Sequence, residues 1–479
     1  MRIFSASSEG VVASRLSPGI ASFCNGPLTL ANSETIRRTS SDGKQILICG
    51  RELAICTRQD EQLLQLSSLS RLHGYAAAWP VIFLIRDPIR VFDSWKYMGC
   101  TNVQHFTSYF IHYFRITQRA DSNLIFYLLY ERLLQQPHRE IEKICSIWDI
   151  AFSNNMLELS APPSPTSAEG SRAGDTNYFR EPPGLSATTK GNSTIVGNIP
   201  CHRLVTNDEK AFIEMAVGRL YVDCWQDHTL KLRGILAEKQ WIGLDLDDTL
   251  HEFRKASSIA SNAVLEAIHA AYGVPLDALT SEYSEILRAS TSNAFSDGKS
   301  SFEHRKDRFL LVAKRFSLPL DSDSPFVIQL LDLYERTLKE SLELKSGAVE
   351  LLRATKAAGK KIVVITEGPQ DAQERTIENL GILPYVDVLA TSSHFKVSKI
   401  DGLFTKVLST LGITPSEIAY VGDSEHRDII PANTEGIFAF HFDEDRDCNL
   451  EVYPPRINTL NKLAYILLGW SHVKVTTTT

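Results

Sequence analysis

Residues 241–250, which read WIGLDLDDTL, decide the fold of the second half of this chain. The first four of these residues form an apolar strand that ends at Asp245. Residues two apart on a strand project to the same side, so Asp245 and Asp247 leave the strand end as neighbours. Two crowded carboxylates repel each other unless a cation or a proton lies between them. A hard divalent ion meets that need, and Mg²⁺ is the usual choice beside phosphate.

The alternation of strand and helix continues along the chain. The segment GAVELLRATKAAGKKIVVIT (347–366) reads as a helix, a glycine stop and a strand. The same order recurs in GLFTKVLSTLGITPSEIAYVGD (402–423). This alternation predicts an α/β fold with a doubly wound parallel sheet. In such sheets ligands bind at the carboxyl ends of the strands, so the residues that follow each strand are candidates for a site.

Side chains suited to phosphate and metal follow these later strands. Thr366 ends one strand, and its hydroxyl and the next backbone N–H groups can hold phosphate oxygens. Asp423 and Asp428 follow the other strand at a GDxxxxD spacing. Lys396 and Lys399 lie between them, and one of these ammonium groups would bind phosphate as a point charge and balance the carboxylates. The spacing alone leaves both lysines open.

The order of these motifs resembles the haloacid dehalogenase superfamily over about residues 241–442. DxDDT comes first, then a Thr after a strand, then a Lys, then GDxxxxD. The resemblance implies that Asp245 is the nucleophile and forms an aspartyl-phosphate. It also implies that Asp247 is the general acid for the leaving group and the base for the hydrolytic water. The dehalogenase branch normally lacks the second Asp, so Asp247 favours phosphatase or phosphotransferase chemistry.

The same resemblance implies roles for the remaining site residues. Thr366 and Lys399 would grip the transferring phosphoryl group. Lys399 is favoured over Lys396, although Ile400 replaces the Pro that often follows this lysine in the family. A Mg²⁺ ion is the implied cofactor. Its implied ligands are Asp245, the backbone carbonyl of Asp247, and Asp423, with Asp428 supporting the metal shell.

The residues just past the paired aspartates can be assigned either a structural or a functional role. Asp248 and Thr249 are interpreted as caps of a helix or turn, in preference to a catalytic role. His251, Glu252 and Arg254 either line the pocket or lie at the surface, and both alternatives stay open.

About a hundred residues separate the first two motifs, far more than a strand-to-strand crossover needs. They read as helices, so we expect a helical cap at residues 256–342. The core of the hydrolase unit is then expected at residues 239–255 and 343–470. A cap excludes water and selects the substrate, which confines the substrate to a small phosphorylated metabolite.

The first half carries a different motif in VIFLIRDPIRVFDSW (residues 81–95). An apolar strand is followed by Arg86, and Ser94 lies on the first turns of the next helix. This is a phosphate-binding arrangement. The alternative interpretation makes Arg86 and Asp87 a local ion pair and Pro88 an ordinary first-turn residue.

Together with later segments, this motif resembles the sulfotransferase family that uses the sulfonate donor PAPS, over about residues 1–228. The resemblance implies an α/β domain of P-loop type in which Arg86 and Ser94 bind the 3′-phosphate of PAPS or PAP. Tyr130 and Glu131 match the family's YE pair and would serve structure.

The predicted donor loop, RIFSASSEGVVASRL, departs from this family. It has Ser7, Ser8 and Gly10, but Glu9 stands where a cation is expected, and a carboxylate there would repel the phosphosulfate. We therefore expect a degenerate domain whose activity is open. The histidines of this half that could act catalytically are equally well explained as packed residues: His73, His105 and His112.

Composition limits the partners of the chain. A net charge of −7 at pH 7 gives no bulk attraction to nucleic acid or anionic membranes. The eight cysteines include no CxxC pair, which favours free thiols and a cytoplasmic protein. The Ser- and Arg-rich first 40 residues also fit a mitochondrial transit peptide, the alternative location. Residues 161–200 are rich in Pro, Ser and Gly and are predicted to be a long loop or linker.

Three functional hypotheses follow from the two halves. The leading one is a Mg²⁺-dependent phosphohydrolase fused to a sulfotransferase-like domain. In the second, both halves are enzymes and the phosphatase acts on a product of sulfonation or on the released nucleotide. In the third, the first half is a docking module that directs the phosphatase. The oligomeric state cannot be predicted from these residues.

Overall fold

The chain divides into two compact units, Met1–Cys224 and Trp225–Thr479. The computed structural model describes residues 81–97, 99, 101–119, 125–147, 152, 203–290 and 297–469 and four short strands, β1 (Arg2–Ser5), β2 (Arg38–Thr39), β3 (Gln45–Ile46) and β4 (Arg51–Glu52). The predicted linker at residues 161–200 and the predicted donor loop after β1 lie outside the described residues.

The first unit contains a sheet with the strand order β4-β1-β5-β6. Strands β5 (Val81–Ile85) and β6 (Ile125–Leu129) are parallel and in register, as a doubly wound α/β unit requires. Strand β1 runs antiparallel to β5, and β4 runs antiparallel to β1. This pairing differs from the all-parallel arrangement that the P-loop resemblance implies, so β1 lends that resemblance no support.

The described part of the first unit also contains several helices. Thr206 caps helix α8 (Asn207–Ile213) by accepting a hydrogen bond from the Glu209 N–H, and Glu209 accepts one from the Thr206 N–H. This is the capping box expected from the sequence. The other helices are α4 (Pro88–Tyr97), α5 (Val103–Arg119), α6 (Tyr130–Gln135), α7 (Pro137–Ile147) and α9 (Arg219–Asp223).

The second unit is built on a sheet with the order β12-β11-β10-β7-β8-β9, in which every pairing is parallel. Its central strand is β7 (Trp241–Leu244), which is buried along its whole length because strands and helices cover both sides. The other strands are β8 (Lys361–Thr366), β9 (Val388–Thr391), β10 (Ile418–Gly422), β11 (Phe438–Phe442) and β12 (Arg456–Ile457).

Register brings the functional strand ends together. Leu244 of β7 pairs with Val421 of β10 on one side and with Val364 of β8 on the other. The chain therefore leaves all three strands at one edge of the sheet. The α/β architecture with a doubly wound parallel sheet is confirmed for this half of the chain.

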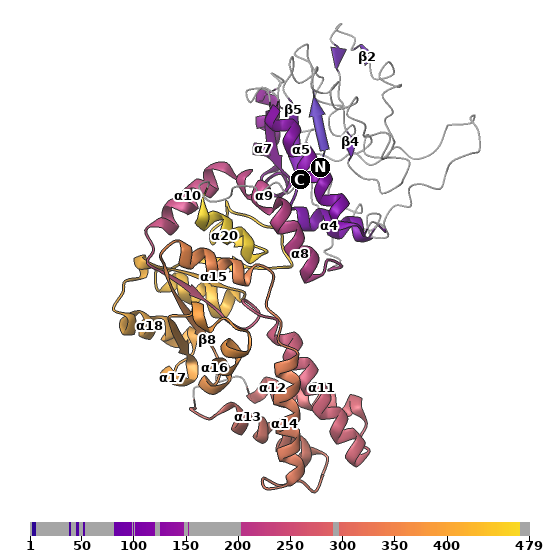
Figure 1. Ribbon diagram of the computed structural model, residues 1–479, viewed down its shortest axis with the longest axis vertical. Helices are drawn as coiled ribbons and strands as arrows, with labels where there is room; N and C mark the ends of the chain where they lie inside the picture. The colour runs from indigo at the N-terminus through magenta and orange to yellow at the C-terminus, as the bar shows by residue number, and fades with distance from the viewer. Residues whose placement is uncertain are drawn as a thin grey trace, which may run out of the picture. The chain divides into compact units, whose positions relative to one another are not determined.

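Helices cover both faces of this sheet (Figure 1). On one face, α18 (Phe404–Leu411) packs its Phe404 and Val407 in a cluster with Trp241, Val363 and Tyr420. On the other side α15 (Ala348–Ala357), α20 (Leu460–Leu468) and α10 (Gln226–Ala237) pack against one another. Helix α10 belongs to the second unit, so the division of the chain lies before it, at Cys224–Trp225.

The segment between β7 and β8 forms a separate helical layer of the second unit, at the lower end of Figure 1. Its helices share a core of their own, which includes Val264, Phe309 and Leu330. This layer occupies the place that was predicted for the cap. The helices are α11 (Phe253–Tyr272), α12 (Leu276–Ser290), α13 (Ser301–Arg315) and α14 (Pro325–Glu340). None of the helices in the described parts of the chain combines the length and the apolar character that a membrane crossing requires.

Gly243, in the middle of β7, lies directly opposite Tyr420 of β10. A Cβ atom at position 243 would lie 2.8 Å from Cδ2 of Tyr420 and 3.2 Å from Cδ1 of Ile418. The Tyr420 ring cannot easily retreat, because it packs edge-on against Phe404 and its hydroxyl donates to Asp428. The absence of a side chain at position 243 is therefore what lets Tyr420 lie across the central strand.

We expect Gly243→Ala to lower the free energy of unfolding of the second unit by about 1–3 kcal/mol, because the added methyl group overpacks against a fixed ring. Equilibrium unfolding in urea measures the change. The control is Gly234→Ala on α10, where a Cβ meets no atom within 4 Å and should raise stability by up to about 1 kcal/mol through helix propensity. Equal stability of Gly243→Ala and the wild type would contradict the packing argument.

Candidate active site

The site begins at Asp245, the first residue after β7. Its backbone N–H donates to the carbonyl oxygen of Val421, which continues the β7–β10 ladder by one residue. Its side chain is only 4% exposed, and Thr249 donates a hydrogen bond to its Oδ2 at 3.1 Å. Thr249 therefore contacts the predicted nucleophile, a role that differs from the cap expected for it. A buried carboxylate at a strand end needs compensating charge or hydrogen bonds.

Compensating charge comes from Lys399, which is 3% exposed. Its Nζ lies 2.5 Å from Oδ1 of Asp245 and 2.5 Å from Oδ1 of Asp428. Lys396 is exposed and ends a short helix, α17 (Ser392–Phe395), away from these contacts. The structure therefore brings Lys399, and not Lys396, to the carboxylates.

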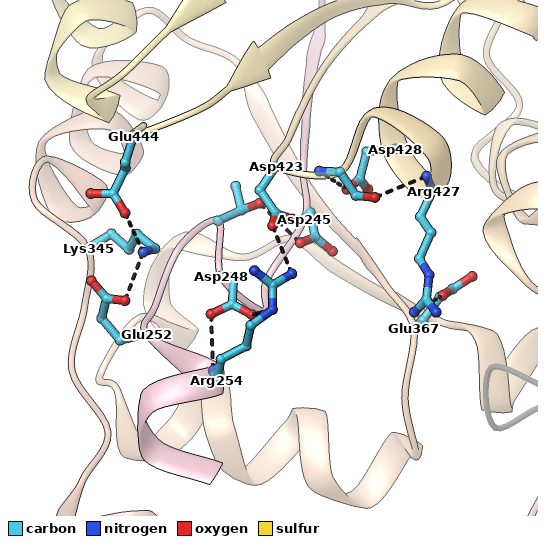
Figure 2. Close-up of polar contacts among 12 residues, drawn as sticks. Asp245, Asp248, Glu252, Arg254, Lys345, Glu367, Asp423, Arg427, Asp428 and Glu444 are labelled. Atoms are coloured by element: carbon cyan, nitrogen blue, oxygen red, sulfur yellow. Dashed lines mark hydrogen bonds and ion pairs between the residues drawn. The ribbon is translucent and has the colours of Figure 1, made fainter. Parts of the chain in front are cut away.

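Three carboxylates meet at this edge of the sheet. Asp245, Asp423 and Asp428 each place an oxygen within 4.8 Å of the others. Figure 2 shows Asp245 and Asp423 from neighbouring strand ends pointing toward one another, with Asp428 nearby. The side chain of Asp247 does not belong to this cluster, and only its backbone carbonyl was expected at the metal.

The crowding changes the proton affinities of these groups. Burial, and after it the charge of Asp428, raises the pKa of Asp423 to about 6. Burial, with further contributions from Asp428 and Asp423, raises the pKa of Asp245 above its usual range against the pull of Lys399. Burial alone would lower the pKa of Lys399, but Asp245 and Asp428 hold it above its ordinary value, so the ammonium keeps its charge. A further cation at the cluster would stabilise the ionised carboxylates.

Asp428 is held from several sides. Tyr420 donates from its hydroxyl to Oδ1 of Asp428 at 2.7 Å, and the Ser424 N–H donates to Oδ2 at 3.0 Å. A Cβ on Gly422 would lie 2.4 Å from Cγ of Asp428. The glycine of GDxxxxD is therefore needed for the close approach of Asp428 to the backbone. The hydroxyl of Tyr420 was not predicted, since an apolar strand pattern gives no sign of it.

Asp247 turns to a different set of partners. Nε2 of His251 lies 3.0 Å from its Oδ1, and the side-chain amide of Gln373 donates to its Oδ2 at 3.1 Å. His251 is fully buried, and Gln373 lies on helix α16 (Gln370–Asn379). These two side chains orient the carboxylate that was predicted to act as acid and base. Gln373 was not predicted, because its distance of 126 residues from Asp247 leaves no local signal.

Thr366 ends β8 beside these groups. Its hydroxyl is buried and has no hydrogen-bond partner among the described residues, a condition that a bound anion would relieve. The N–H of Gly368, which was expected to approach phosphate, donates instead to the hydroxyl of Ser392 at 3.0 Å. Thr366 is thus the group of this strand end that remains available to a ligand.

Arg254 connects the acidic cluster to the start of the cap. Its guanidinium lies 3.1 Å from Asp248 and 3.3 Å from Asp423, as Figure 2 shows. Asp248 also accepts from the Arg254 N–H at the start of α11, the capping role expected for it. Glu252 pairs with the buried Lys345. Of the three residues left open, Arg254 lines the cavity, His251 contacts Asp247 and Glu252 makes a structural ion pair.

A cavity of about 550 Å³ joins the sheet edge to the cap layer. Asp245, Asp247, Thr366 and Lys399 line it from the core. Helices α13 and α14 line it from the cap, with side chains such as Arg308 and Tyr334. A volume of this size suits a small molecule.

In the first unit the predicted anion-binding residues lie on their expected elements. Arg86 follows β5, and its guanidinium lies over the Tyr130 ring at 4.8 Å. Asp87 caps α4 through the N–H groups of Ile89 and Arg90, so α4 begins at Pro88 as the alternative interpretation proposed. The hydroxyl of Ser94 donates to the carbonyl of Arg90 at 3.1 Å. Of the histidines considered, His105 packs edge-on against Tyr109, while His73 and the side chain of His112 lie outside the described residues.

Part of this chain is similar in sequence to known hydrolases. Residues 240–435 match the family model of haloacid dehalogenase-like hydrolases. A glyceraldehyde 3-phosphate phosphatase of Methanocaldococcus jannaschii is 30% identical over 40% of this chain and 80% of that protein. A ribulose-1,5-bisphosphate 5-phosphatase of Halopiger xanaduensis is 28% identical over 42% of this chain and 84% of that protein. The solved structure of a phosphatase of this family from Thermococcus onnurineus is 23% identical over 48% of this chain and 97% of that chain, with a TM-score of 0.37.

We expect Lys399→Met to lower the free energy of unfolding by about 3–5 kcal/mol at pH 7 without divalent ions, because buried carboxylates lose their cation. The loss should shrink as the pH falls from about 7 to about 5. Buried carboxylates with raised pKa values bind more protons in the folded state than in the unfolded one, so protonation favours folding. Urea unfolding at several pH values measures this. Lys396→Met is the control and should change stability by less than about 0.5 kcal/mol.

Proposed function

Because the chain belongs to the haloacid dehalogenase-like hydrolase family, we propose that it is a phosphatase that uses Asp245 to cleave small phosphorylated metabolites. The observation that carries the proposal is the buried pair of Asp245 and Lys399 at the floor of a cavity. A carboxylate and an ammonium side by side provide a nucleophile for the phosphorus atom and a binding group for the oxygen atoms of the same phosphoryl group.

The chain's own residues supply each part of the reaction. A carboxylate oxygen of Asp245 bonds to phosphorus while the bond from phosphorus to the ester oxygen breaks. Asp247 gives a proton to that departing oxygen, and His251 and Gln373 keep its carboxyl group in place. In the second step Asp247 takes a proton from the water that attacks the aspartyl-phosphate, which regenerates Asp245. The hydroxyl of Thr366 and the charge of Lys399 hold the phosphoryl oxygens.

The acidic cluster fits the magnesium ion that this family implies. The donors are carboxylate oxygens, which a hard cation prefers, and burial, followed by the charge of Asp428, raises the pKa of Asp423. Asp245 and Asp423 would hold the ion together with the backbone carbonyl of Asp247, and Asp428 would support them. When bound, the ion stabilises negative charge on the phosphoryl oxygens. Arg254 also brings positive charge to Asp423.

The relatives support a sugar phosphate or a similar small ester as the substrate. The names of both relatives describe the release of phosphate from phosphorylated sugars of a few carbons. The cavity, closed over by α13 and α14, has room for a molecule of that size. Residues 239–255 and 343–470 form the proposed core and residues 256–342 the proposed cap.

We expect Asp245→Asn to lose a thousandfold or more in kcat, because no neighbouring group can form the covalent intermediate. A panel of phosphorylated metabolites with Mg²⁺, and with EDTA in its place, measures phosphate release. Asp248→Asn serves as the matched carboxylate control and should retain most of the activity. Full turnover by Asp245→Asn, or none by the wild type on any ester, would refute the proposal.

For the first unit we propose a sulfotransferase-like anion site at Arg86 and Ser94. Support comes from the position of Arg86 at the end of a parallel strand, held over Tyr130, and from Glu131, which accepts the Asp87 N–H at 2.8 Å. This matches the structural role implied for Tyr130 and Glu131. The bifunctional enzyme and the docking module remain the alternative forms of the proposal. We also propose a cytoplasmic location, with mitochondria as the alternative, and the free thiol of the buried Cys224 supports it.

We expect the chain to bind PAP, with the 3′-phosphate held by Arg86, and Arg86→Ala to weaken that binding roughly tenfold or more because a charge-assisted contact is lost. Calorimetry on the full chain measures both. Arg90→Lys, on the same helix, is the control for general charge. The absence of heat and of any thermal shift with PAP would leave the docking module as the account of this half.

A further inference from the structure

The cap wall of the cavity carries a buried cation that the proposed reaction does not use. Arg308 lies on α13, lines the cavity and is only 8% exposed. Its Nε donates to the carbonyl of His304 at 3.2 Å, which orients the guanidinium plane. Within residues 203–290 and 297–469, no carboxylate lies at ion-pair distance from Arg308. A buried charge without a partner is costly, so a ligand is the natural source of its counter-charge.

Two arginines near Arg308 differ from it in having acidic partners. Arg305, one helical turn earlier, pairs with Glu335 and lies over the Tyr334 ring at 4.4 Å. Arg375 of α16 pairs with Asp371 at 3.0 Å and with Glu335 at 3.4 Å. Both side chains therefore have acidic partners, and Arg308 is the exception among the three.

Charge counting gives the same result. The three guanidinium groups of Arg305, Arg308 and Arg375 have only two carboxylates among them, from Glu335 and Asp371, so this cluster of five side chains carries one excess positive charge. Burial, and then the repulsion of Arg308 and Arg375, lowers the pKa of Arg305 below its ordinary value, which reflects how near the three groups are. An anion bound at this wall would relieve that repulsion.

The wall is also fixed to the catalytic core. Ser301, the first residue of α13, donates from its hydroxyl to Asp371 at 2.6 Å and from its N–H at 3.0 Å. Arg375 donates to the same hydroxyl at 2.7 Å. Asp371 and Arg375 belong to α16, which also carries Gln373, so one helix contacts both the first residue of the helix that carries Arg308 and the carboxylate of Asp247. A ligand that spans the cavity meets both ends in a set geometry.

We propose that Arg308 is the centre of an anion subsite, and that the substrate carries a second acidic group, a carboxylate or a phosphate, at the end remote from the phosphoryl group that is cleaved. This inference rests on the proposed function and specifies its substrate class. Lys399 and Thr366 bind the reacting phosphoryl group from the core, and Arg308 binds the other acidic group from the cap. An ester with a neutral remote end leaves Arg308 without a counter-charge and is turned over less well.

Two matched pairs of esters test this inference. At the end remote from the phosphate, glycerol 3-phosphate has a hydroxyl group and 3-phosphoglycerate has a carboxylate. Ribulose 5-phosphate and ribulose 1,5-bisphosphate differ in a second phosphate. We expect kcat/KM of the wild-type chain to be roughly ten- to a hundredfold higher for the doubly acidic member of at least one pair, with free Mg²⁺ kept in excess. The pair with the higher ratio identifies the group as carboxylate or phosphate.

We expect Arg308→Ala to bring that ratio close to one, mainly through a higher KM for the doubly acidic ester, and Arg308→Lys to restore part of it. Arg315→Ala, at the end of the same helix, is the control. Arg315 is 67% exposed and pairs with Glu282 outside the cavity, so its loss should leave the ratio unchanged.

Different results would contradict the anion subsite and the phosphatase proposal. A wild-type ratio near one for both pairs, or an equal loss for both members of a pair in Arg308→Ala, overturns the anion subsite while the phosphatase stands. No turnover of any ester refutes the phosphatase. In that case calorimetry with the Asp245→Asn chain decides the subsite. Tighter binding of the doubly acidic ester, weakened by Arg308→Ala, supports it, and equal binding of both esters rejects it.

Discussion

The structure of the hydrolase unit depends on one electrostatic constraint, the repulsion of carboxylates that the ends of two neighbouring parallel strands, β7 and β10, bring to a single edge. Lys399 relieves this repulsion by lying between Asp245 and Asp428. Hydrogen-bond donors contribute too, since the Asp245 carboxylate accepts from the Thr249 hydroxyl and the Asp428 carboxylate accepts from the Ser424 N–H. Asp423 pairs only with the exposed Arg254 among the described residues, and burial, followed by the charge of Asp428, raises its pKa to about 6. The edge is therefore arranged to accept one more cation, which is also what phosphoryl transfer requires.

Much of this half could be predicted from the sequence because its signals are local. Asp245 and Asp247 follow a strand directly, Asp423 and Asp428 are five residues apart, and parallel strands must end at a common edge. The choice of Lys399 over Lys396 came from resemblance to a family, and the buried contacts of Lys399 agree with it. The helical cap was predicted from the length and helical pattern of residues 256–342.

The unpredicted residues act through long-range contacts. Gln373 reaches Asp247 across 126 residues, and the pairing of Gly243 with Tyr420 depends on the register of two distant strands. Arg308 looks like any charged residue on an amphipathic helix until its neighbours are known. In the first half the strand β5 was predicted because its apolar run is a local signal. The donor loop could not be judged, since it lies outside the described residues.

The contact between Gly243, Tyr420 and Asp428 has a consequence for the descent of this protein. A side chain at position 243 would displace the Tyr420 ring, and a displaced ring would withdraw the hydroxyl that Asp428 accepts. A substitution at any one of these three positions therefore disrupts the contact unless the other two change with it. In a collection of orthologues, these three sites should co-vary as a single inherited unit.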